Sequence, residues 1–469
     1  MHSRGFHIAE TKKHFSAVMQ HEKRKDGTVR KRHIRMIQKE EGSMYKCSIE
    51  RMSDKIKAFS RFGDAGHGGI TRYALSREDE QAREEFRRRM EAIGARIECD
   101  DLACMYATIE GTDSNARRIA VGSHCDSVKN GGNYDGILGV MTGMEILETV
   151  VAEGIPHRHP LTAMIWTNEE GALYPPAIMV SGIICNEYLP DDLAVNFRYD
   201  KMMASKPIDD CRYADFGEAL AAFPFRGPAE NRISPERYCA MFEAHLEQGP
   251  ILEDNGNEAG AVQLVMGMFN YRVRFHGFTA HAGTFPMAKR HDALFAASTF
   301  LCEMHRRFDE LNEGQEPEFV YTTGEIYVHP GIHTCINSDA EFSLDVRHPD
   351  PAVRAEALKI LREMASQEWC GCTCEIEEQW VRDTVYFDRT LTGFVEESME
   401  ELGLSWQRIL SGAGHDAQFC AYMIPTTMLF ARTRNGLSHC EDEYVSAEDC
   451  TAVASAALNA VLKADMYYD

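Results

Sequence analysis

The stretch "RRIAVGSHCDSVKNGGNYDGILGVMTGMEILETVVAEG", residues 117–154, decides the fold class. It opens with a short apolar run, which predicts a buried strand, and closes with a long apolar segment that stops at a glycine, which predicts a helix. Between them lies a glycine-rich polar loop that carries His124, Asp126 and Asp135. A strand, a loop and a helix in this order form the repeating unit of α/β folds.

The same alternation recurs along most of the chain. Three more apolar runs, residues 159–171, 238–250 and 425–432, predict strands that end in polar groups. A Ser-capped amphipathic segment at residues 446–465 predicts a closing helix, because its first residues have the capping-box pattern. We therefore expect an α/β fold with a mixed, largely parallel sheet flanked by helices.

The middle of the chain has a different pattern. Four segments alternate apolar and polar residues, as exposed strands do, and two helical segments separate them. This predicts a smaller α+β domain, residues 266–382, inserted between the two parts of a catalytic domain, residues 44–265 and 383–469. The expected strands are residues 271–281, 319–330, 339–348 and 372–380, and the expected helices lie near 288–312 and 351–369.

Composition narrows the class of protein. The 469 residues are 44% hydrophobic and 26% charged, which is ordinary for a globular protein. The formal net charge of -23 argues against a nucleic-acid partner, which needs a basic face. No apolar run approaches the roughly 18 residues of a membrane span, so we expect no membrane partner.

Cysteine usage bears on the compartment. The odd number of 15 scattered cysteines favours reduced thiols, and we expect a cytoplasmic protein. The densest cluster, "CGCTC" at Cys370, Cys372 and Cys374, is an alternative soft-metal site. Its period-two alternation with the residues that follow favours a strand.

The N-terminal 43 residues stand apart, with 11 Lys/Arg against 5 Asp/Glu. A basic tail for an acidic partner is one interpretation. The other is a translated leader: "KEEGS" precedes Met44, and a purine-rich codon run for Lys-Glu-Glu would resemble a bacterial ribosome-binding site.

Polar side chains gather where the predicted strands end. An open parallel sheet builds its site at that edge. Imidazoles and carboxylates are ligands that zinc, manganese and cobalt accept. Each cluster alone is more typical of a hydrogen-bonded or solvated turn, and the hypothesis of a metal site depends on their recurrence. The residues are His124, Asp126, Asp135, Glu169, Glu170, His245, Glu247 and His439.

Several stretches of the chain are similar to stretches of one group of enzymes, and they occur in the same order as in those enzymes. The chain resembles the carbamoylase branch of the di-metal aminopeptidase–aminoacylase superfamily. That branch includes N-carbamoyl-L-amino-acid hydrolases, β-ureidopropionases and allantoate amidohydrolases. The matching stretches are "GSHCDSVKNGGNYDGILGV", "TNEEG", "EAHLEQGPILE", "HGFTAHAGTFPMAKRHDA", "FSLDVRHPD", "SGAGHDAQ" and "GLSHCEDEY".

The resemblance implies two divalent metal ions per subunit, of zinc, manganese, cobalt or nickel. His124 and His245 would hold one metal, and Glu170 and His439 the other. Asp135 would bridge the two ions. It also implies cleavage of the carbamoyl C–N bond of N-carbamoyl-L-amino acids to amino acid, ammonia and carbon dioxide.

The remaining roles follow from the same resemblance. Asp126 would orient His124, as carboxylates commonly do for metal-bound imidazoles. Glu169 would be the general base. His415 and His281 would help to stabilise the oxyanion, with His281 reaching in from the inserted domain.

Substrate contacts would come from Gln248 at the carbamoyl end and from Arg347 at the carboxylate. Closure of the inserted domain would bring these groups together, and that domain would also form a homodimer. The chain departs from the family at one substrate contact, because ungapped alignment on Arg347 puts Thr334 at the family's Asn position, three residues before Asn337. Either Asn337 binds the substrate after a local shift, or this contact is altered.

Two further departures leave the substrate open. After "NEEG" the chain reads "ALYPPAIMVSG", where relatives more often have Arg-Phe and a Gly-Ser. Arg432 and Arg434 stand where relatives carry an apolar-Pro-Ser stretch, and they would favour an acidic substrate unless they are solvated. The alternatives are an allantoate or ureidoglycine-type amidohydrolase or a β-ureidopropionase, then an aminoacylase or peptidase, and finally a metal-binding protein without activity.

Overall fold

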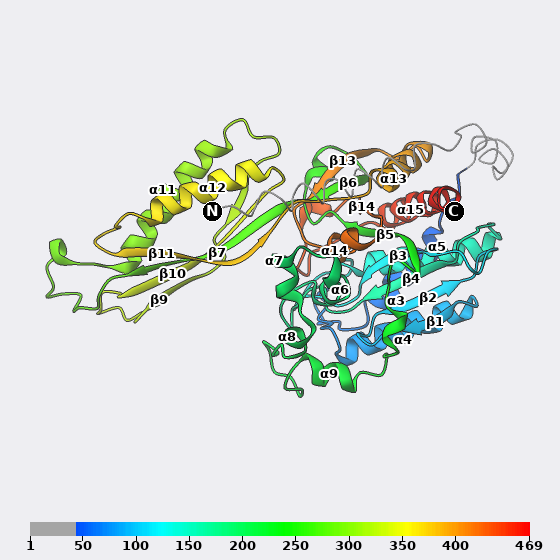
Figure 1. Cartoon of the computed structure of the whole chain (residues 1–469), viewed down its shortest axis with the longest axis horizontal. Coiled ribbons are helices and arrows are strands. Elements are labelled where there is room, and N and C mark those ends of the chain that lie inside the picture. The colour runs from blue at the N-terminus through cyan, green and yellow to red at the C-terminus, as the bar shows by residue number, and fades with distance from the viewer. Residues whose placement is uncertain (1–43) are drawn as a thin grey trace, which may run out of the picture. The chain divides into compact units, whose positions relative to one another are not determined.

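The structure is a computed structural model that describes residues 44–469, so the two interpretations of residues 1–43 lie outside the described part. Two separate sheets organise the described chain (Figure 1). The first has nine strands in the order β1-β2-β4-β3-β5-β14-β6-β12, with β13 paired to β6. Its strands are β1 (Arg96–Cys99), β2 (Met105–Ile109), β3 (Arg118–His124), β4 (Leu161–Trp166), β5 (Tyr238–Leu246), β6 (Ala259–Val265), β12 (Val385–Tyr386), β13 (Trp406–Ser411) and β14 (Thr426–Ala431).

The centre of this sheet is parallel. Strand β3 pairs in parallel with both β4 and β5, and β5 pairs in parallel with β14. Antiparallel pairs lie outside this centre, between β1, β2 and β4 on one side and between β14, β6 and β12 on the other. The predicted mixed α/β sheet is confirmed, and its parallel strands bring their carboxyl ends to one edge.

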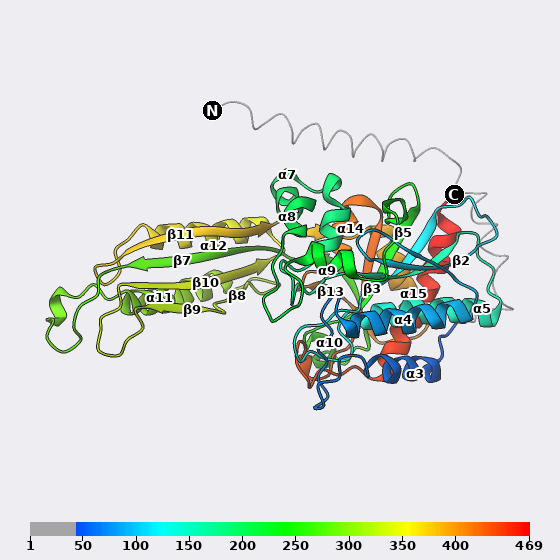
Figure 2. The same cartoon turned by 90° about the horizontal axis from the view of Figure 1, so that it is seen from below.

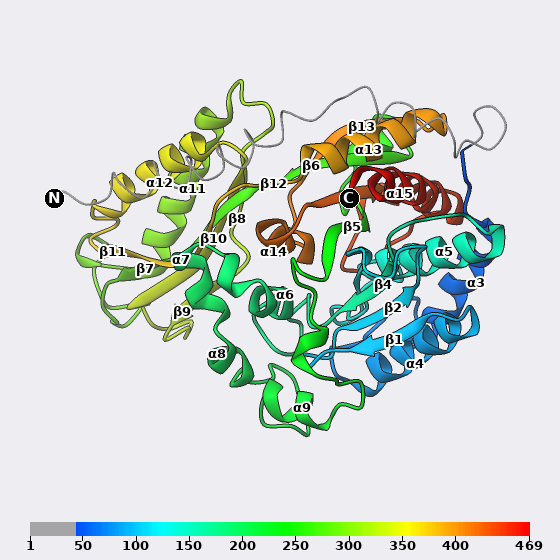
Figure 3. The same cartoon turned by 45° about the vertical axis from the view of Figure 1, so that its right-hand side comes forward.

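Helices cover both faces of the sheet. Successive residues of β4 point to opposite faces: Ala163 faces Gly143 of α5, and Met164 joins the apolar core that contains α6 and α14. Helix α5 also packs against α3 and α15 (Figure 2), and α15 packs against α13 (Figure 3). The helices are α3 (Ile49–Phe59), α4 (Arg77–Ala92), α5 (Ile137–Glu153), α6 (Met179–Ile184), α7 (Asp191–Ala194), α8 (Tyr199–Met203), α9 (Phe216–Ala222), α10 (Ile251–Asp254), α13 (Arg389–Glu401), α14 (Asp416–Met423) and α15 (Ala447–Tyr467).

The second sheet is antiparallel and comes from the middle of the chain. Its order is β11-β7-β10-β8, with β9 also paired to β10. Helices α11 (Ala293–Asn312) and α12 (Pro351–Ala365) pack on one face through a separate apolar core. The other face carries charged residues such as Arg272, Arg274 and Glu341. Its strands are β7 (Gly267–His276), β8 (Val320–Thr322), β9 (Ile326–His329), β10 (Asp339–His348) and β11 (Thr373–Arg382).

Strand and cap predictions can be compared with these bounds. The closing helix α15 has the expected cap, since the Ser446 side chain accepts the backbone N–H of Asp449. The predicted strand 319–330 is instead two strands, β8 and β9, because the chain breaks at the intervening Thr-Gly-Glu. The "CGCTC" stretch leads into β11, and the metal-binding groups found among residues 44–469 contain no cysteine.

All 15 cysteines lie in the described part and are free thiols, as their scattered spacing predicts. Across residues 44–469, every helix is too short or too polar to cross a lipid bilayer.

Candidate metal centre

The predicted ligands lie where the central strands end. His124 is the last residue of β3, and His245 is the last but one of β5. Glu170 follows β4, and His439 lies in the loop between β14 and α15. Asp135 stands just before helix α5. Residues more than 300 positions apart in the sequence are thereby collected at one edge of the sheet.

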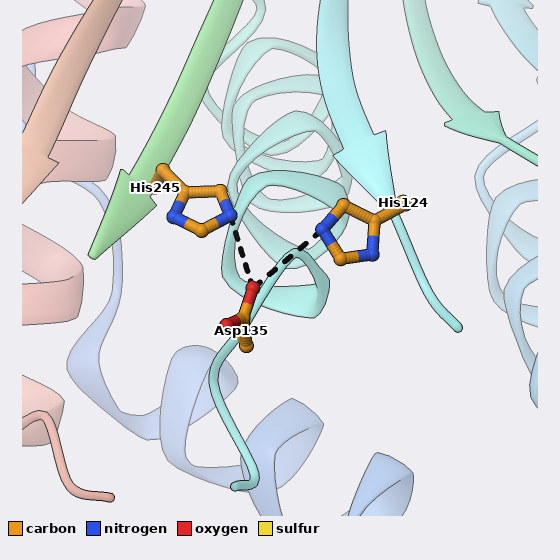
Figure 4. Close-up of side chains that lie close together, drawn as sticks. All are labelled: His124, Asp135 and His245. Carbon is orange, nitrogen blue, oxygen red and sulfur yellow. Dashed lines mark ion pairs between the residues drawn. The ribbon is translucent and has the colours of Figure 1, made fainter. Parts of the chain in front are cut away.

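His124, Asp135 and His245 form a first buried group. Both imidazoles point to the same carboxylate oxygen (Figure 4): Asp135 Oδ1 is 3.6 Å from His124 Nε2 and 3.2 Å from His245 Nε2. The three ligand atoms lie within 4.8 Å of one another. This group therefore offers two nitrogens and one oxygen to a single ion.

Asp135, Glu170 and His439 form a second group, which uses the other oxygen of the same aspartate. Asp135 Oδ2 is 3.2 Å from His439 Nε2, and that nitrogen is 3.6 Å from Glu170 Oε2. These three ligand atoms also lie within 4.8 Å of one another. Asp135 is thus shared between both groups, with one oxygen facing each.

The donor set fits two divalent ions. Four tetrahedral ligands about 2.1 Å from a zinc ion lie about 3.4 Å from one another. The imidazole–carboxylate distances of 3.2–3.6 Å agree with that spacing. The buried oxygen Glu170 Oε1 has no hydrogen-bond partner in the described part of the chain. A cation in the second group would give this oxygen a partner.

The electrostatics of the cluster also favour cations. Burial, and after it the charge of Asp135, raises the pKa of Glu170 to about 8. Burial would raise the pKa of Asp135 too, but hydrogen bonds from three histidines outweigh it and hold that pKa well below its usual range. The hydrogen bond to Asp135 raises the pKa of His439 to about 9. Carboxylates this close need positive charge beside them to stay ionised together.

Glycine is required at position 136 for two reasons. Its φ of +65° lies in the left-handed region, and a Cβ there would stand 2.2 Å from the His124 ring. Gly136 therefore lets the helix start close under the imidazole. The glycines at 131 and 132 do not have positive φ; they leave room for Val128 and Glu443.

Asp126 acts differently from the prediction. Its backbone carbonyl, and not its carboxylate, is the partner of His124 Nδ1, at 2.9 Å against 3.8 Å for Oδ1. The carboxylate instead accepts the backbone N–H groups of Glu169 and Glu170, at 3.3 and 3.1 Å. The strand ends β3 and β4 are close enough for this bond, so Asp126 positions the glutamate pair.

Glu169 lies beside the first group. Its Oε2 is 3.5 Å from His124 Nε2, and the side chain is buried. Burial raises the pKa of Glu169 well above its usual range, and Glu170 adds to this effect although His124 opposes it. The position agrees with the predicted general base, and the role stays a prediction.

His415 is also brought to the cluster, on the turn before α14. Its ring centre is 4.5 Å from that of His245, and burial holds its pKa well below the usual range. The Ser411 hydroxyl donates to Ala413 O, so it accepts from His415 Nε2 at 3.0 Å. With the hydrogen on Nε2, Nδ1 is an acceptor, so His415 donates from Nδ1 only in the other tautomer, in which the Ser411 hydroxyl donates to Nε2.

Gln248 reaches the bridging carboxylate. Its Nε2 donates to Asp135 Oδ2 at 2.8 Å and lies 3.3 Å from His439 Nε2. Its buried Oε1 has no hydrogen-bond partner among the described residues. Glu247, in contrast, turns away and accepts the N–H groups of Ile251 and Leu252, so it caps the start of α10 and does not join the cluster.

The predicted residues of the inserted segment have other partners in this structure. His281 is exposed and accepts the N–H of Gly283. Asn337 Oδ1 accepts the N–H of Gly331, and Thr334 contributes only its carbonyl. Arg347 donates to both oxygens of Asp345, and its Nη1 donates to Gly412 O at 2.6 Å. The Arg347 guanidinium, which we expect to bind the substrate carboxylate, is therefore paired with Asp345 in this structure.

The two unusual arginines have structural contacts. Arg432 makes a two-pronged ion pair with Asp449 at the start of α15. The Arg434 guanidinium lies 4.0 Å from the ring centre of Tyr444. The interpretation that they would select an acidic substrate is not supported, because both guanidinium groups already have partners.

Two buried acids that no sequence pattern indicated hold the site together. Glu243 of β5 accepts the Ser123 hydroxyl at 2.6 Å and the Ala417 N–H at 2.8 Å, so it links the turns next to His124 and His415. Glu443, four residues after His439, accepts the N–H groups of Tyr134 and Asp135. Glu443 is one of three acids in "CEDEY", and the sequence alone does not distinguish it from its exposed neighbours.

Comparison with known proteins assigns the chain and its fold to a family. The profile of peptidase family M20/M25/M40 matches residues 120–463. N-carbamoyl-L-amino-acid amidohydrolase from Rhizobium meliloti is 32% identical over 90% of this chain and 98% of its own length. Allantoate amidohydrolase from Bacillus subtilis is 30% identical over 86% of this chain and 94% of its own length.

A solved structure agrees with these matches. An amidase of the hydantoinase/carbamoylase family from Burkholderia multivorans has a TM-score of 0.78 and 31% identity, over 89% of this chain and 98% of that one. The chain therefore belongs to peptidase family M20/M25/M40, and within that family to the amidohydrolases of the carbamoylase branch, which hydrolyse C–N bonds.

Proposed function

We propose that the protein cleaves the ureido C–N bond of N-carbamoyl-L-amino acids and releases the amino acid, ammonia and carbon dioxide. The observation that carries this proposal is the shared carboxylate of Asp135, with one oxygen facing each of two ligand groups. The similarity to an N-carbamoyl-L-amino-acid amidohydrolase over nearly the full length of both chains supports the substrate class.

Two divalent ions, of zinc, manganese, cobalt or nickel, fit the two groups. His124 and His245 would hold one ion, Glu170 and His439 the other, and Asp135 both. When bound, the ions would lower the pKa of a water molecule towards neutrality and polarise the scissile carbonyl.

Glu169 moves the proton in this proposal. It accepts a proton from the attacking water and returns it to the nitrogen that leaves. Its buried position beside His124, together with a raised pKa, suits a group that must both take and release a proton near neutral pH. Cleavage gives two products, the free amino acid and carbamate. The carbamate then breaks down to ammonia and carbon dioxide.

Substrate recognition would use both sheets. The unpartnered Oε1 of Gln248 suits the ureido –NH2 group, which is a donor. His281, Asn337 and Arg347 would reach the substrate after the second domain closes, and Arg347 would then exchange Asp345 for the substrate carboxylate. His415 would assist at the oxyanion as the neutral tautomer that carries its hydrogen on Nδ1, with the Ser411 hydroxyl turned to donate to Nε2.

Allantoate is the second candidate substrate. An allantoate amidohydrolase is 30% identical to this chain, close to the 32% of the carbamoylase, and its name places its substrate among ureido acids. The chemistry at the metal centre would be the same for both substrates.

A substrate panel tests the proposal. Purified protein loaded with Zn²⁺, Mn²⁺, Co²⁺ or Ni²⁺ is given N-carbamoyl-L-amino acids, N-carbamoyl-β-alanine, allantoate, N-acetyl-L-amino acids and dipeptides. We expect the highest kcat/KM for N-carbamoyl-L-amino acids, measured as ammonia and amine release. Preference for allantoate or N-carbamoyl-β-alanine would replace the substrate and keep the reaction, whereas turnover of only peptides or N-acetyl amino acids would contradict both.

Glu169→Gln tests the base. We expect kcat to fall about 10²–10⁴-fold, because the amide cannot take a proton. Metal content, measured by plasma mass spectrometry, should stay at the wild-type value. Glu187→Gln, at an exposed glutamate, is the control and should keep full activity. Full activity in the Glu169→Gln protein would assign the base to another residue.

We also propose a homodimer formed through the second domain. Strands β8 and β9 lie at the outer edge of the sheet, where unpaired backbone groups can pair with a second copy. Apolar side chains are exposed there, with Ile326 50% and Tyr327 55% accessible. Sedimentation velocity should show a dimer for the wild type and a monomer for Ile326→Lys/Tyr327→Glu; a monomeric wild type would refute the proposal.

A further inference from the structure

Glu443 is a buried acid that belongs to neither ligand group yet contacts the residues that carry both. Its Oε1 accepts the backbone N–H groups of Tyr134 and Asp135, each at 3.0 Å. Its Oε2 accepts the hydroxyl of Ser438 at 2.7 Å. One carboxylate therefore connects the bridging aspartate to the residue before His439, across about 300 positions of sequence.

The bond to Ser438 also affects the bridging carboxylate directly. Ser438 Oγ lies 3.1 Å from Asp135 Oδ2, farther than its 2.7 Å from Glu443. A serine hydroxyl has one hydrogen, so the two carboxylates compete for it. When Glu443 takes that hydrogen, Asp135 Oδ2 has one hydrogen-bond donor fewer and is more available to a cation.

The loop that carries His439 needs such an anchor. His439 has a φ of +56°, in the left-handed region that non-glycine residues rarely adopt. Such a conformation persists only when the surroundings fix it. The N–H of Glu443 donates to Cys440 O at 3.2 Å and closes the turn after the histidine.

Packing around Glu443 shows that the contact is built into the fold. A Cβ on Gly132 would lie 2.0 Å from Glu443 Oε1, so any larger residue there would displace the carboxylate. The next residue, Tyr444, packs edge-on against Tyr134 with ring centres 5.7 Å apart. Arg434 covers the Tyr444 ring. The His439 loop is thus fastened to the Asp135 loop at two neighbouring points.

We propose that Glu443 is a positioning residue for the second group, which sets His439 and Asp135 at the distance that one ion needs. This inference rests on the two-ion centre of the proposed function. The alternative is a purely structural role. The Glu443 carboxylate lies beside the residues that precede α5, where a negative charge also stabilises the positive end of that helix. A structural role predicts lower stability without weaker metal binding, so the two can be separated.

Metal affinity tests the inference without any substrate. Zn²⁺ is titrated into metal-free protein in competition with a chromophoric chelator, and bound metal is counted by plasma mass spectrometry. For Glu443→Ala we expect one of two ions to bind about 10–100-fold more weakly, the usual effect of losing a group that orients a ligand. The other ion, which keeps both His124 and His245, should be weakened less.

Two variants serve as comparisons. Glu443→Gln keeps an amide oxygen for both N–H groups, but its amide nitrogen donates to Ser438, whose hydrogen then turns to Asp135 Oδ2. We therefore expect the second ion to bind more weakly than in the wild type and more tightly than in Glu443→Ala. Glu441→Ala, at an exposed acid two residues away, removes the same charge from the same loop and should bind both ions as the wild type does. Thermal unfolding of each metal-free protein reports separately on folding.

The outcomes are distinct. Wild-type affinity for both ions in Glu443→Ala would overturn the inference and leave the metal centre intact. If Glu443→Ala does not fold, Ser438→Ala takes its place, with a smaller weakening of one ion expected and wild-type affinity for both ions again overturning the inference. If the wild type itself binds fewer than two ions, the two-ion centre fails and the inference fails with it.

Discussion

The shared carboxylate of Asp135 is the interaction on which the rest of the site depends. One oxygen faces two imidazoles and the other faces an imidazole and a glutamate. To serve both groups, Asp135 must stand between the strand ends of β3 and β5 and the loops that carry Glu170 and His439. The left-handed turn at Gly136 and the anchor from Glu443 meet this constraint, since they fix the backbone on both sides of the carboxylate.

This arrangement concentrates negative charge in a buried place. Glu169 and Glu170 lie near Asp135, and Asp126 bonds to the backbone of both glutamates. A buried charge is costly unless it is paired. Behind the site, the protein supplies buried cations. Arg72 donates to the carbonyl of Cys125, between His124 and Asp126, and Arg83 pairs with Asp79 at 2.7 Å. On the open side two divalent ions would complete the balance.

Much of this could be predicted from the sequence, because local signals and site chemistry agreed. Strand β10 has the predicted bounds, and the ligands of each group stand at strand ends as expected. Pairing between strands far apart in the sequence could not be predicted. Strands β6 and β13 were not expected, because each depends on a partner that only the folded chain brings beside it. For the same reason Asp126 and Glu443 could not be assigned their contacts, which join segments that only the tertiary structure brings together.

Substrate recognition was the least predictable part, because it depends on residues from two sheets. Arg347 has a side chain suited to a carboxylate clamp, yet here it bonds Asp345 and Gly412. Arg432 and Arg434 look like added positive charge in the sequence, but their partners Asp449 and Tyr444 lie 17 and 10 positions further along the chain. The reaction class agrees with the metal groups, whereas the substrate depends on contacts that the proposed domain closure would change.

Anomalous diffraction from crystals of the Zn²⁺- or Mn²⁺-loaded protein tests the central claim most directly. If two ions share Asp135, we expect two anomalous peaks about 3.5–4 Å apart. One peak should lie beside His124 and His245 and the other beside Glu170 and His439, with Asp135 between them. A single peak, or two peaks that do not share Asp135, would contradict it.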